Sequence, residues 1–263
     1  IFPNSPAAGL LAQNQTIGSI LLKDKTRIQA DSYILATGGK SRPETGSTGD
    51  GFTWLKTIGH EVAEPQAALV PVVVKDAWIK RIQGLSLSNA KITLLQNDVK
   101  QNTSKGSILF THFGLSGPAI LNVSKDIGEL LKYGEVVVSL DLLPALNEQK
   151  LDAEIRGLMA KQINKKLGNC LGAFIPAALV PIIIELSGIR SDTFNNSVTR
   201  EERLRLGKLL KHMPLRVARL LGVEKAIITS GGVMLKEVDF TTMRSRLFQN
   251  LYFAGDILNI DRP

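Results

Sequence analysis

Hydrophobic and polar positions follow two different periods along this chain, and together they predict an α/β protein. Short apolar runs that end near glycine, at 33–36 and 250–254, are typical of buried strands. Further short apolar runs at 70–74, 91–95 and 107–110 are separated by turn residues. This spacing predicts a small unit built mainly of strands. A turn-rich opening, 1–8, and a hairpin with strands 18–22 and 27–30 come before them.

From Asn147 onwards the apolar spacing becomes helical, so this part of the chain predicts a group of helices. Asn147 is a suitable N-cap for the first helix. Thr199 and Glu202 fit the capping box at the start of a later helix. A last helix is expected over 215–221, ended by Gly222. The apolar face of the first helix consists of Leu151, Ile155, Leu158, Met159 and Ile163.

The uncharged stretch 167–184 is long enough to raise the question of a membrane span. Pro176 and Pro181 interrupt it, as do Gly168 and Gly172. A short buried helix that starts near Pro176 is the better interpretation, because proline is tolerated at the beginning of a helix and not inside it. We therefore expect no membrane-spanning segment.

Cysteine and histidine usage restricts the chemistry further. Cys170 is the only cysteine, so the chain can form neither an internal disulfide nor a cysteine-based metal cluster. His60, His112 and His212 are far apart and lack the spacing of metal ligands, so no metal is expected. The chain opens at Ile1 with no methionine and no basic leader, which indicates a start that is not the native N-terminus. These features favour a reducing, cytoplasmic location.

The most informative segment is 33–51, in which a predicted strand runs into Thr37-Gly38-Gly39 and then into a loop rich in serine, threonine and glycine. Adjacent glycines permit a sharp turn and let a ligand approach the backbone closely. Asp50 is placed to cap the helix predicted over 51–58. A strand, a glycine turn and a helix start form a typical site for a phosphate-containing ligand in an open α/β sheet. The alternative is an ordinary turn.

A second strand end carries Gly255 followed by Asp256. A carboxylate at that position does not favour a phosphate, because like charges repel. It does accept hydrogen bonds from sugar or ribityl hydroxyl groups, and the glycine leaves room for the ligand chain. That chemistry suits FAD, whereas the alternative is an aspartate that caps a helix.

The net charge of +8 fits either a basic surface that keeps the protein in solution or a field that attracts phosphates and other anions. Aromatic residues make up only 5% of the chain, which argues against a platform for stacking bases. No run of lysine and arginine resembles a nucleic-acid-binding tail. Nucleic acid is therefore not the expected partner.

Four segments resemble, in the same order, the HI0933-like family of bacterial FAD-dependent oxidoreductases. They are ILATGGKS at 34–41 with TGSTGDG at 45–51, LFTHFGLSGPAIL at 109–121, TSGGV at 229–233 and LYFAGDILNID at 251–261. The resemblance implies a glutathione-reductase-like FAD-binding domain that is interrupted by an inserted β domain and a helical domain. With the changes of pattern above, it divides the chain into the first part of the FAD-binding domain (1–65), the inserted β domain (66–146), the helical insert (147–221), the return strand of the β insert (222–235) and the last part of the FAD-binding domain (236–263).

The same resemblance implies which residues lie at the cofactor. Thr37, Gly38 and Gly39 would lie beside FAD, and Gly255 and Asp256 would contact its ribityl–pyrophosphate region. Gly231 and Gly232 match a glycine pair that brings the return strand of the insert near the flavin pocket.

The chain also departs from the family. It has no GxGxxG unit, it ends at Pro263 before the family's TGGY-type loop, and Arg42 stands where an aromatic residue is common. The GxGxxG turn supplies most pyrophosphate contacts in such folds. Residues 1–263 expressed alone are therefore expected to purify without FAD and without colour.

These features predict a flavoprotein oxidoreductase that uses FAD, with NAD(P)H as the expected reductant and a small-molecule substrate of unknown identity. The flavin carries the redox chemistry, so no catalytic side chain need stand out in the sequence. His112 is either an acid–base group or a structural histidine in a turn. One alternative is a nucleic-acid-associated flavoprotein, comparable to those that modify tRNA, which would show a contiguous positive stripe on the helical insert. The other is a non-catalytic remnant that binds a partner through its inserts.

Overall fold

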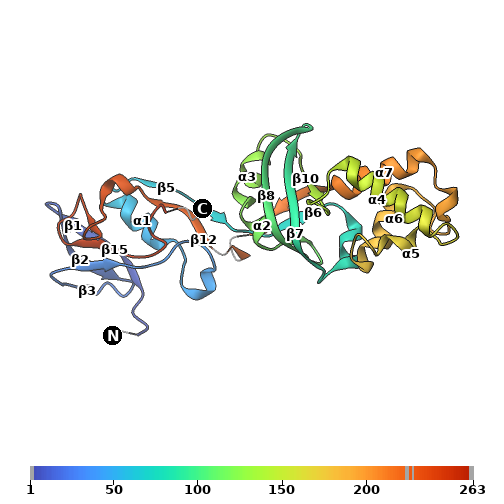
Figure 1. Ribbon diagram of the computed structural model, residues 1–263. Coiled ribbons are helices and arrows are strands. Elements are labelled where there is room, and N and C mark those ends of the chain that lie inside the picture. The colour runs from blue at the N-terminus through green and yellow to red at the C-terminus, as the bar shows by residue number, and fades with distance from the viewer. Residues whose placement is uncertain (1–2, 223–224, 227, 261–263) are drawn as a thin grey trace. The chain divides into compact units, whose positions relative to one another are not determined.

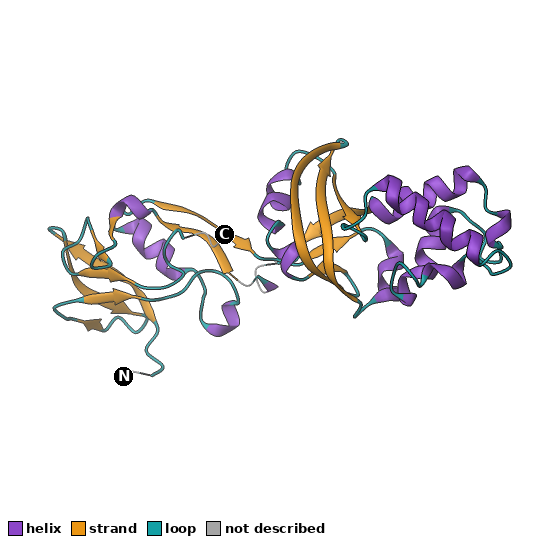
Figure 2. Ribbon diagram, in the orientation of Figure 1, coloured by secondary structure: helices purple, strands orange, loops and turns teal. Residues whose placement is uncertain are grey.

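The computed structural model describes residues 3–222, 225–226 and 228–260, which form two compact units. The first unit combines two separate parts of the chain, Ile1–Val70 and Leu221–Pro263, and the second is the continuous segment Pro71–Leu220 (Figure 1). Figure 2 shows that strands predominate in the first unit, whereas the second contains both a barrel of strands and a group of helices.

The described part of the first unit contains three small sheets, the helix α1 (Asp50–Thr57) and short 3₁₀ helices at Pro43–Thr45 and Leu235–Glu237. One antiparallel sheet contains β1 (Ala7–Gln13), β2 (Thr16–Leu22) and β3 (Arg27–Ile28). A four-stranded sheet has the order β13 (Val238–Asp239), β14 (Arg244–Ser245), β15 (Leu251–Phe253), β4 (Tyr33–Leu35). The third sheet pairs β5 (Val62–Ala68) with β12 (Ile228–Val233).

The core of the first unit joins the helix α1 to the neighbouring strands β4 and β15. Phe52 and Leu55, three residues apart on α1, are buried in the same cluster as Leu35 of β4 and Phe253 of β15. This spacing places both side chains on one face of the helix. The elements on either side of the glycine loop therefore share one hydrophobic core.

Six strands of the second unit close into an antiparallel barrel with the order β10-β11-β6-β9-β8-β7. Alternate residues point inward, as the strand period requires, so that Ile92 and Leu94 on β7 and Ile108 and Phe110 on β8 are fully buried. The barrel strands are β6 (Val72–Val74), β7 (Ser86–Gln96), β8 (Val99–Phe110), β9 (Gly114–Ser116), β10 (Val136–Asp141) and β11 (Met213–Leu220).

Helices lie on two sides of this barrel, α2 and α3 on one side and α4 to α7 on the other (Figure 1). The side chain of Asn147 accepts a hydrogen bond from the Lys150 amide, and Thr199 forms a full capping box with Glu202, which confirms both predicted helix starts. One hydrophobic core runs from the barrel into the helices. The helices are α2 (Pro118–Leu121), α3 (Ser124–Leu130), α4 (Glu148–Lys161), α5 (Gly168–Leu171), α6 (Val180–Ser187) and α7 (Arg200–Lys211).

The second unit begins and ends on two neighbouring barrel strands, β6 and β11. The helical segment within it also begins and ends on neighbouring strands, β10 and β11. β6 and β11 pair so that Val72 lies opposite Leu220, close to the two ends of the second unit. β10 and β11 pair so that Leu140 lies opposite Met213, and α4 to α7 occupy the chain between them.

The structure corrects three expectations. The predicted helix over 215–221 is wrong, because Met213, Leu215 and Val217 alternate with exposed residues as the inward positions of β11. The segment placed at 222–235 as the return strand of the β insert contains β12, which pairs with β5 and not with the barrel. The opening at 1–8 is not only turns, since β1 begins at Ala7.

No helix among the described residues is long and apolar enough to cross a membrane. The stretch 167–184 is divided among α5, a short 3₁₀ helix at Ala177–Leu179 and the first part of α6. Pro181 occupies the first turn of α6, where its missing N–H group leaves no hydrogen bond unmade.

Candidate functional site

The two glycine-bearing strand ends meet at one edge of the four-stranded sheet. β4 and β15 are parallel neighbours with Leu35 opposite Phe253, and the Ala254 amide donates to the Leu35 carbonyl at 3.1 Å. Parallel strands present their carboxyl ends at the same edge. The structure therefore brings the predicted residues 37–39 and 255–256 together, although they are far apart in sequence.

A cleft of about 290 Å³ lies at this edge of the first unit. Gly255 adopts a φ of +79° and has open space where a side chain would start, with nothing within 4 Å. Asp256 beside it is exposed. The residues that line the cleft are Ile228, Thr229, Met243, Gly255, Asp256, Leu258 and Ile260.

Thr229 of β12 holds the glycine loop in place. Its buried Oγ1 accepts hydrogen bonds from the backbone amides of Lys40 at 2.6 Å and Ser41 at 3.0 Å, and it lies 3.0 Å from Ser41 Oγ. Two amides occupy the acceptor positions of Oγ1, so the Thr229 hydroxyl donates to Ser41 Oγ. A Cβ atom at Gly39 would collide with the Thr229 side chain, which explains the glycine there.

Thr37 and Gly38 lie where the chain turns from β4 towards α1. Gly38 has a φ of +71°, and a side chain there would meet Ser47 Oγ at 2.6 Å. Thr37 Oγ1 is buried beneath Gly51 and has no hydrogen-bond partner among the described residues. Gly49, in the left-handed region at φ 82°, provides the N-cap of α1 without a side-chain hydrogen bond. The predicted cap by Asp50 is therefore wrong by one position, because Asp50 is already the first helical residue.

Gly231 and Gly232 are explained by contacts within the protein. A side chain at Gly231 would meet the Glu64 carbonyl oxygen at 2.6 Å, and one at Gly232 would meet the Ile257 carbonyl oxygen at 2.6 Å. The Val233 amide donates to the Ile257 carbonyl at 2.9 Å. This pair therefore lets β12 pack against β5 and against the chain that follows Gly255, and its predicted contact with a cofactor stays a prediction.

The residues at this edge fit a flavin dinucleotide in three respects. An open glycine with positive φ lies next to an exposed carboxylate, a buried hydroxyl lacks a partner, and the first turn of α1 offers backbone N–H groups. Amides at a helix start favour phosphate groups, and a carboxylate favours sugar hydroxyls. The described residues contain no group of three or more histidine, cysteine or acidic side chains that could hold a metal ion.

Sequence reasoning missed a buried histidine below this sheet. His60 Nδ1 lies 2.6 Å from Glu237 Oε2, and its Nε2 lies 3.0 Å from Ser245 Oγ. The imidazole packs against the rings of Phe248 and Phe253. With all of its side chain buried and both nitrogens engaged, His60 is a structural residue. Its partners are distant in sequence, so no local pattern indicates them.

His112, the histidine that the sequence offers as an acid–base group, belongs to the second unit. His112 is exposed in the turn between β8 and β9 of the second unit, where its ring contacts that of Phe113. An acid–base role for His112 stays a prediction.

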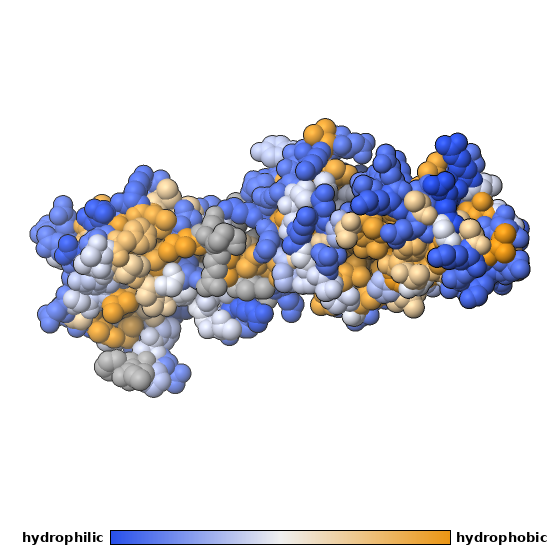
Figure 3. Space-filling model, in the orientation of Figure 1, coloured by the Kyte–Doolittle hydropathy of each residue, from blue (hydrophilic) through white to orange (hydrophobic). Residues whose placement is uncertain are grey.

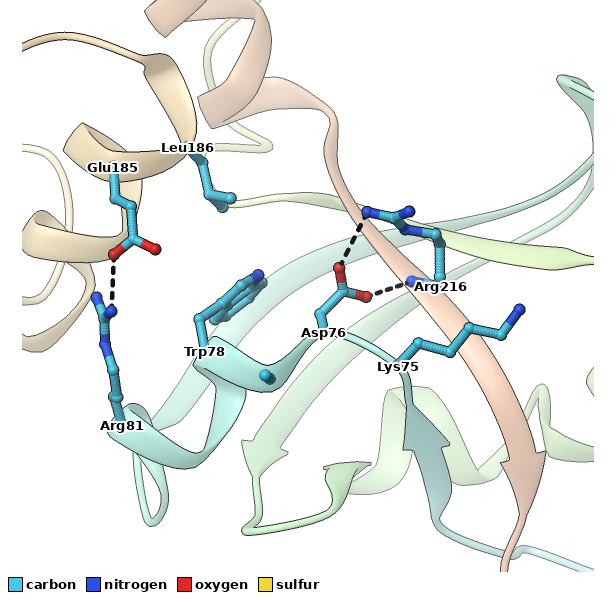
Figure 4. Close-up of a pocket in the computed structure, with 8 residues that line it drawn as sticks. Lys75, Asp76, Trp78, Arg81, Glu185, Leu186 and Arg216 are labelled. Carbon is cyan, nitrogen blue, oxygen red and sulfur yellow. Dashed lines mark hydrogen bonds and ion pairs between the residues drawn. The ribbon is translucent and has the colours of Figure 1, made fainter.

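A larger cavity, of about 550 Å³, lies within the second unit (Figure 4). Its charges are largely compensated: Arg81 pairs with Glu185 at 2.7 Å, and Asp76 lies 3.7 Å from the Arg216 guanidinium and also accepts a hydrogen bond from the Arg216 amide at 2.7 Å. Trp78 lies between these two pairs in Figure 4. The cavity combines an aromatic side chain with fixed ion pairs, and it has none of the glycine turns that mark the edge of the first unit.

Comparisons with known proteins also distinguish the barrel and its helices from the rest of the chain. The family described as "HI0933-like protein barrel and H2TH domain" matches residues 66–228, which include all of the barrel and its helices. The chain is 30% identical over 254 residues to a ribosomal RNA dihydrouridine synthase of Haemophilus influenzae, with 95% of this chain and 59% of that protein covered.

Two further relatives have similar identity and coverage. A 3-dehydro-bile acid delta(4,6)-reductase of Clostridium scindens is 28% identical over 253 residues, with 93% of this chain and 60% of the relative covered. A ribosomal RNA dihydrouridine synthase of Escherichia coli is 27% identical over 251 residues, with coverages of 95% and 60%. The chain thus spans about three fifths of the length of these relatives. Because the family match covers most of its residues, the chain belongs to the HI0933-like family.

Proposed function

We propose that this chain is part of an FAD-dependent oxidoreductase. The observation that carries the proposal is the meeting of Thr37–Gly39 and Gly255–Asp256 at the carboxyl edge of two parallel strands. Open α/β sheets bind their ligands at this edge. The family membership and the names of the relatives, a reductase and two dihydrouridine synthases, support the same class of reaction.

The chain's own residues have distinct tasks in this proposal. Asp256 accepts hydrogen bonds from ribityl hydroxyl groups, and Gly255 leaves the backbone open so that the ribityl chain can approach. Thr37 Oγ1, which lacks a partner in the described residues, donates to or accepts from the cofactor. Thr229 keeps the amides of Lys40 and Ser41 in a fixed loop beside it. When bound, the flavin supplies hydride transfer.

The reactions in the names of the relatives concern one chemical class of bond. A delta(4,6)-reductase acts on carbon–carbon double bonds, and dihydrouridine differs from uridine by two hydrogens across one such bond. In the 3-oxo steroid skeleton and in uracil, that bond is conjugated with a carbonyl group. We propose a two-electron reduction in which NAD(P)H provides a hydride, solvent provides a proton, and a C=C bond next to a carbonyl becomes CH–CH.

The test uses the full-length protein, because the chain spans only part of its relatives. Its absorption spectrum is recorded with and without added FAD, and stopped-flow spectroscopy then follows bleaching by NADH and NADPH. Reoxidation is measured with a 3-oxo-4-ene steroid and with uridine-containing RNA. A yellow protein whose reduced flavin is reoxidised by either acceptor supports the proposal. A full-length protein that binds no FAD contradicts it.

A further inference from the structure

The helical part of the second unit contains a compact basic turn, residues 161–166, at the end of α4. Lys161, Lys165 and Lys166 are all exposed, and so are Ile163 and Asn164 between them. The segments 161–169 and 190–197 pack together and contain four basic residues and one acidic residue. That one carboxylate, Asp192, already accepts two hydrogen bonds from Arg190 at 3.0 and 2.7 Å.

The local field at this turn is positive. The pKa of the Asp192 carboxyl is lowered, first by the hydrogen bond from Arg190 and also by the charge of Lys166. Among the described residues no ion pair to an acidic side chain is recorded for Lys161 or Lys165. Their ammonium groups are available to an external anion.

Hydrogen bonds hold the turn in one conformation. The Lys165 amide donates to the Gln162 carbonyl at 2.9 Å, and the Asn195 amide donates to the Lys165 carbonyl at 2.9 Å. The side chain of Asn195 also donates to the Gln162 carbonyl, at 2.8 Å, and the buried Cys170 thiol donates to Gln162 Oε1 at 3.3 Å. A surface that is already ordered loses less conformational entropy when a ligand binds.

An exposed aromatic ring and an apolar groove adjoin the lysines. Phe194, 46% exposed, pairs with Lys166 across an antiparallel bridge, which directs the two side chains to the same face. A groove of about 390 Å³ lies mainly between α5 and α6 and reaches the two segments at Gly168, Asn169 and Ser191; the rest of its lining is Gly172, Ala177, Val180, Pro181 and Ile184. Figure 3 shows apolar patches among hydrophilic side chains on the face of the helical part that it presents.

We propose that the basic turn, Phe194 and the adjoining groove form a docking surface for single-stranded RNA. Lysines bind successive phosphates, the Phe194 ring stacks on an unpaired base, and the groove receives an apolar base face. The proposal rests on the proposed function, because it names the class of substrate that the reductase takes. This proposal reverses the expectation from composition that nucleic acid is not a partner. Aromatic residues are few, but one of them, Phe194, lies beside the basic turn.

The larger cavity of the second unit fits RNA less well. Its cations are already bound by carboxylates: Arg81 by Glu185, Lys75 by Glu135 and Arg216 by Asp76. A phosphate would have to displace those partners. The basic turn has three lysines, and the one carboxylate in the adjoining segment, Asp192, is already paired with Arg190, so RNA phosphates add charge compensation that the protein itself lacks.

The charge test compares two triple variants of the full-length protein. K161Q/K165Q/K166Q neutralises the basic turn, and K80Q/K100Q/K105Q neutralises three exposed lysines of the barrel part as a matched control. Binding of a labelled single-stranded RNA oligonucleotide is titrated over a range of salt concentrations. In the first variant, the magnitude of the slope of log K against log salt should decrease by about 2. Its affinity for RNA at low salt should fall on the order of 100-fold. The control should keep the wild-type slope.

The groove test uses two glycines with free space. Gly172 has a φ of −60° and nothing within 4 Å of its Cβ position, so Gly172→Leu fills the groove without backbone strain. Gly157, exposed on α4 and equally open, gives the control Gly157→Leu. Gly172→Leu and Phe194→Ala should each weaken RNA binding about tenfold with an unchanged salt slope, since stacking is not an ionic contact. Gly157→Leu should bind like the wild type.

Flavin absorbance and small-enone reduction are measured in every variant, which separates this inference from the proposed function. Loss of RNA binding with intact flavin supports the docking surface. The surface is refuted if both triple variants lose affinity equally, if poly-glutamate binds as tightly as RNA, or if the wild type reduces the enone and binds no RNA. Loss of flavin from the wild type would instead contradict the proposed function.

Discussion

Replacing Thr229 by valine should release the glycine loop at the candidate cofactor site. The substitution nearly preserves size and removes one hydroxyl, which accepts from the amides of Lys40 and Ser41 and touches Ser41 Oγ. Thr229 is 4% exposed and Ser41 is 9% exposed, so in the variant these donors lose their partner in a place where water enters poorly.

The expected magnitude follows from the number of donors left without a partner. A buried donor without a hydrogen bond destabilises by about 1–3 kcal/mol, and two amides are affected. Lys40 is exposed and its amide regains water when the loop moves, so the net effect on loop opening should be about 2–3 kcal/mol. That free energy corresponds to exchange of the Lys40 and Ser41 amides that is roughly 30- to 160-fold faster.

The assay is native-state amide hydrogen exchange of the full-length protein, read for the peptide that contains residues 38–42. Thr229→Ser is the control, since it keeps the oxygen and removes only a methyl group, and it should exchange much more slowly than the valine variant. FAD affinity should fall in the valine variant if the ordered loop helps to bind the cofactor. Unchanged exchange at Lys40 and Ser41 in Thr229→Val would refute the reasoning, because the loop would then be held by something else.

Three further substitutions test other parts of the structure. Asp256→Ala should weaken FAD binding to the full-length protein by about 1.5–3 kcal/mol, whereas equal dissociation constants in an FAD titration would remove Asp256 from the site. Gly39→Ala should destabilise the first unit by about 1–3 kcal/mol in thermal unfolding, because its Cβ would overlap Thr229; a variant as stable as the wild type would show that the loop can shift. Lys211→Met should destabilise the second unit by about 3–5 kcal/mol in urea unfolding, since it leaves the Asp141 carboxylate, 13% exposed and 2.7 Å from Lys211 Nζ, without its partner. The double variant K211M/D141N should recover part of that loss.

Local patterns were sufficient to predict the two strands that carry the candidate site. Tyr33–Leu35 and Leu251–Phe253 are short apolar runs followed by glycine, and both form strands whose first and third residues are buried, although Ile34 in the first of them is 72% exposed. Residues 215–221 were misassigned because Gly222 resembles a helix stop. The alternation of Leu215 and Val217 with Arg216 has the period of a strand, and it decides the structure through pairing with β10 and β6.

Contacts between distant parts of the chain could not be predicted in this way. Thr229 binds amides that lie 188 and 189 residues away, and the TSGGV segment that it begins gives no sign of that contact. The glycines at 231 and 232 stood out as a motif, but their surroundings show close packing of backbone against backbone. The basic turn was overlooked because its lysines are few, and its character depends on Phe194 and Asp192 from another segment.

The pairing of Val72 with Leu220 has a consequence for the order of folding. The first unit needs residues on both sides of Pro71–Leu220, and closing so long a loop in an unfolded chain is entropically unfavourable. Once the barrel has formed, its two ends lie one strand spacing apart, about 4.8 Å, and the same closure is easier by on the order of 3 kcal/mol. We therefore expect the second unit, made of one continuous segment, to fold first and to bring β12 close to β5 and β15 close to β4, so that the candidate cofactor site is among the last parts of the molecule to form.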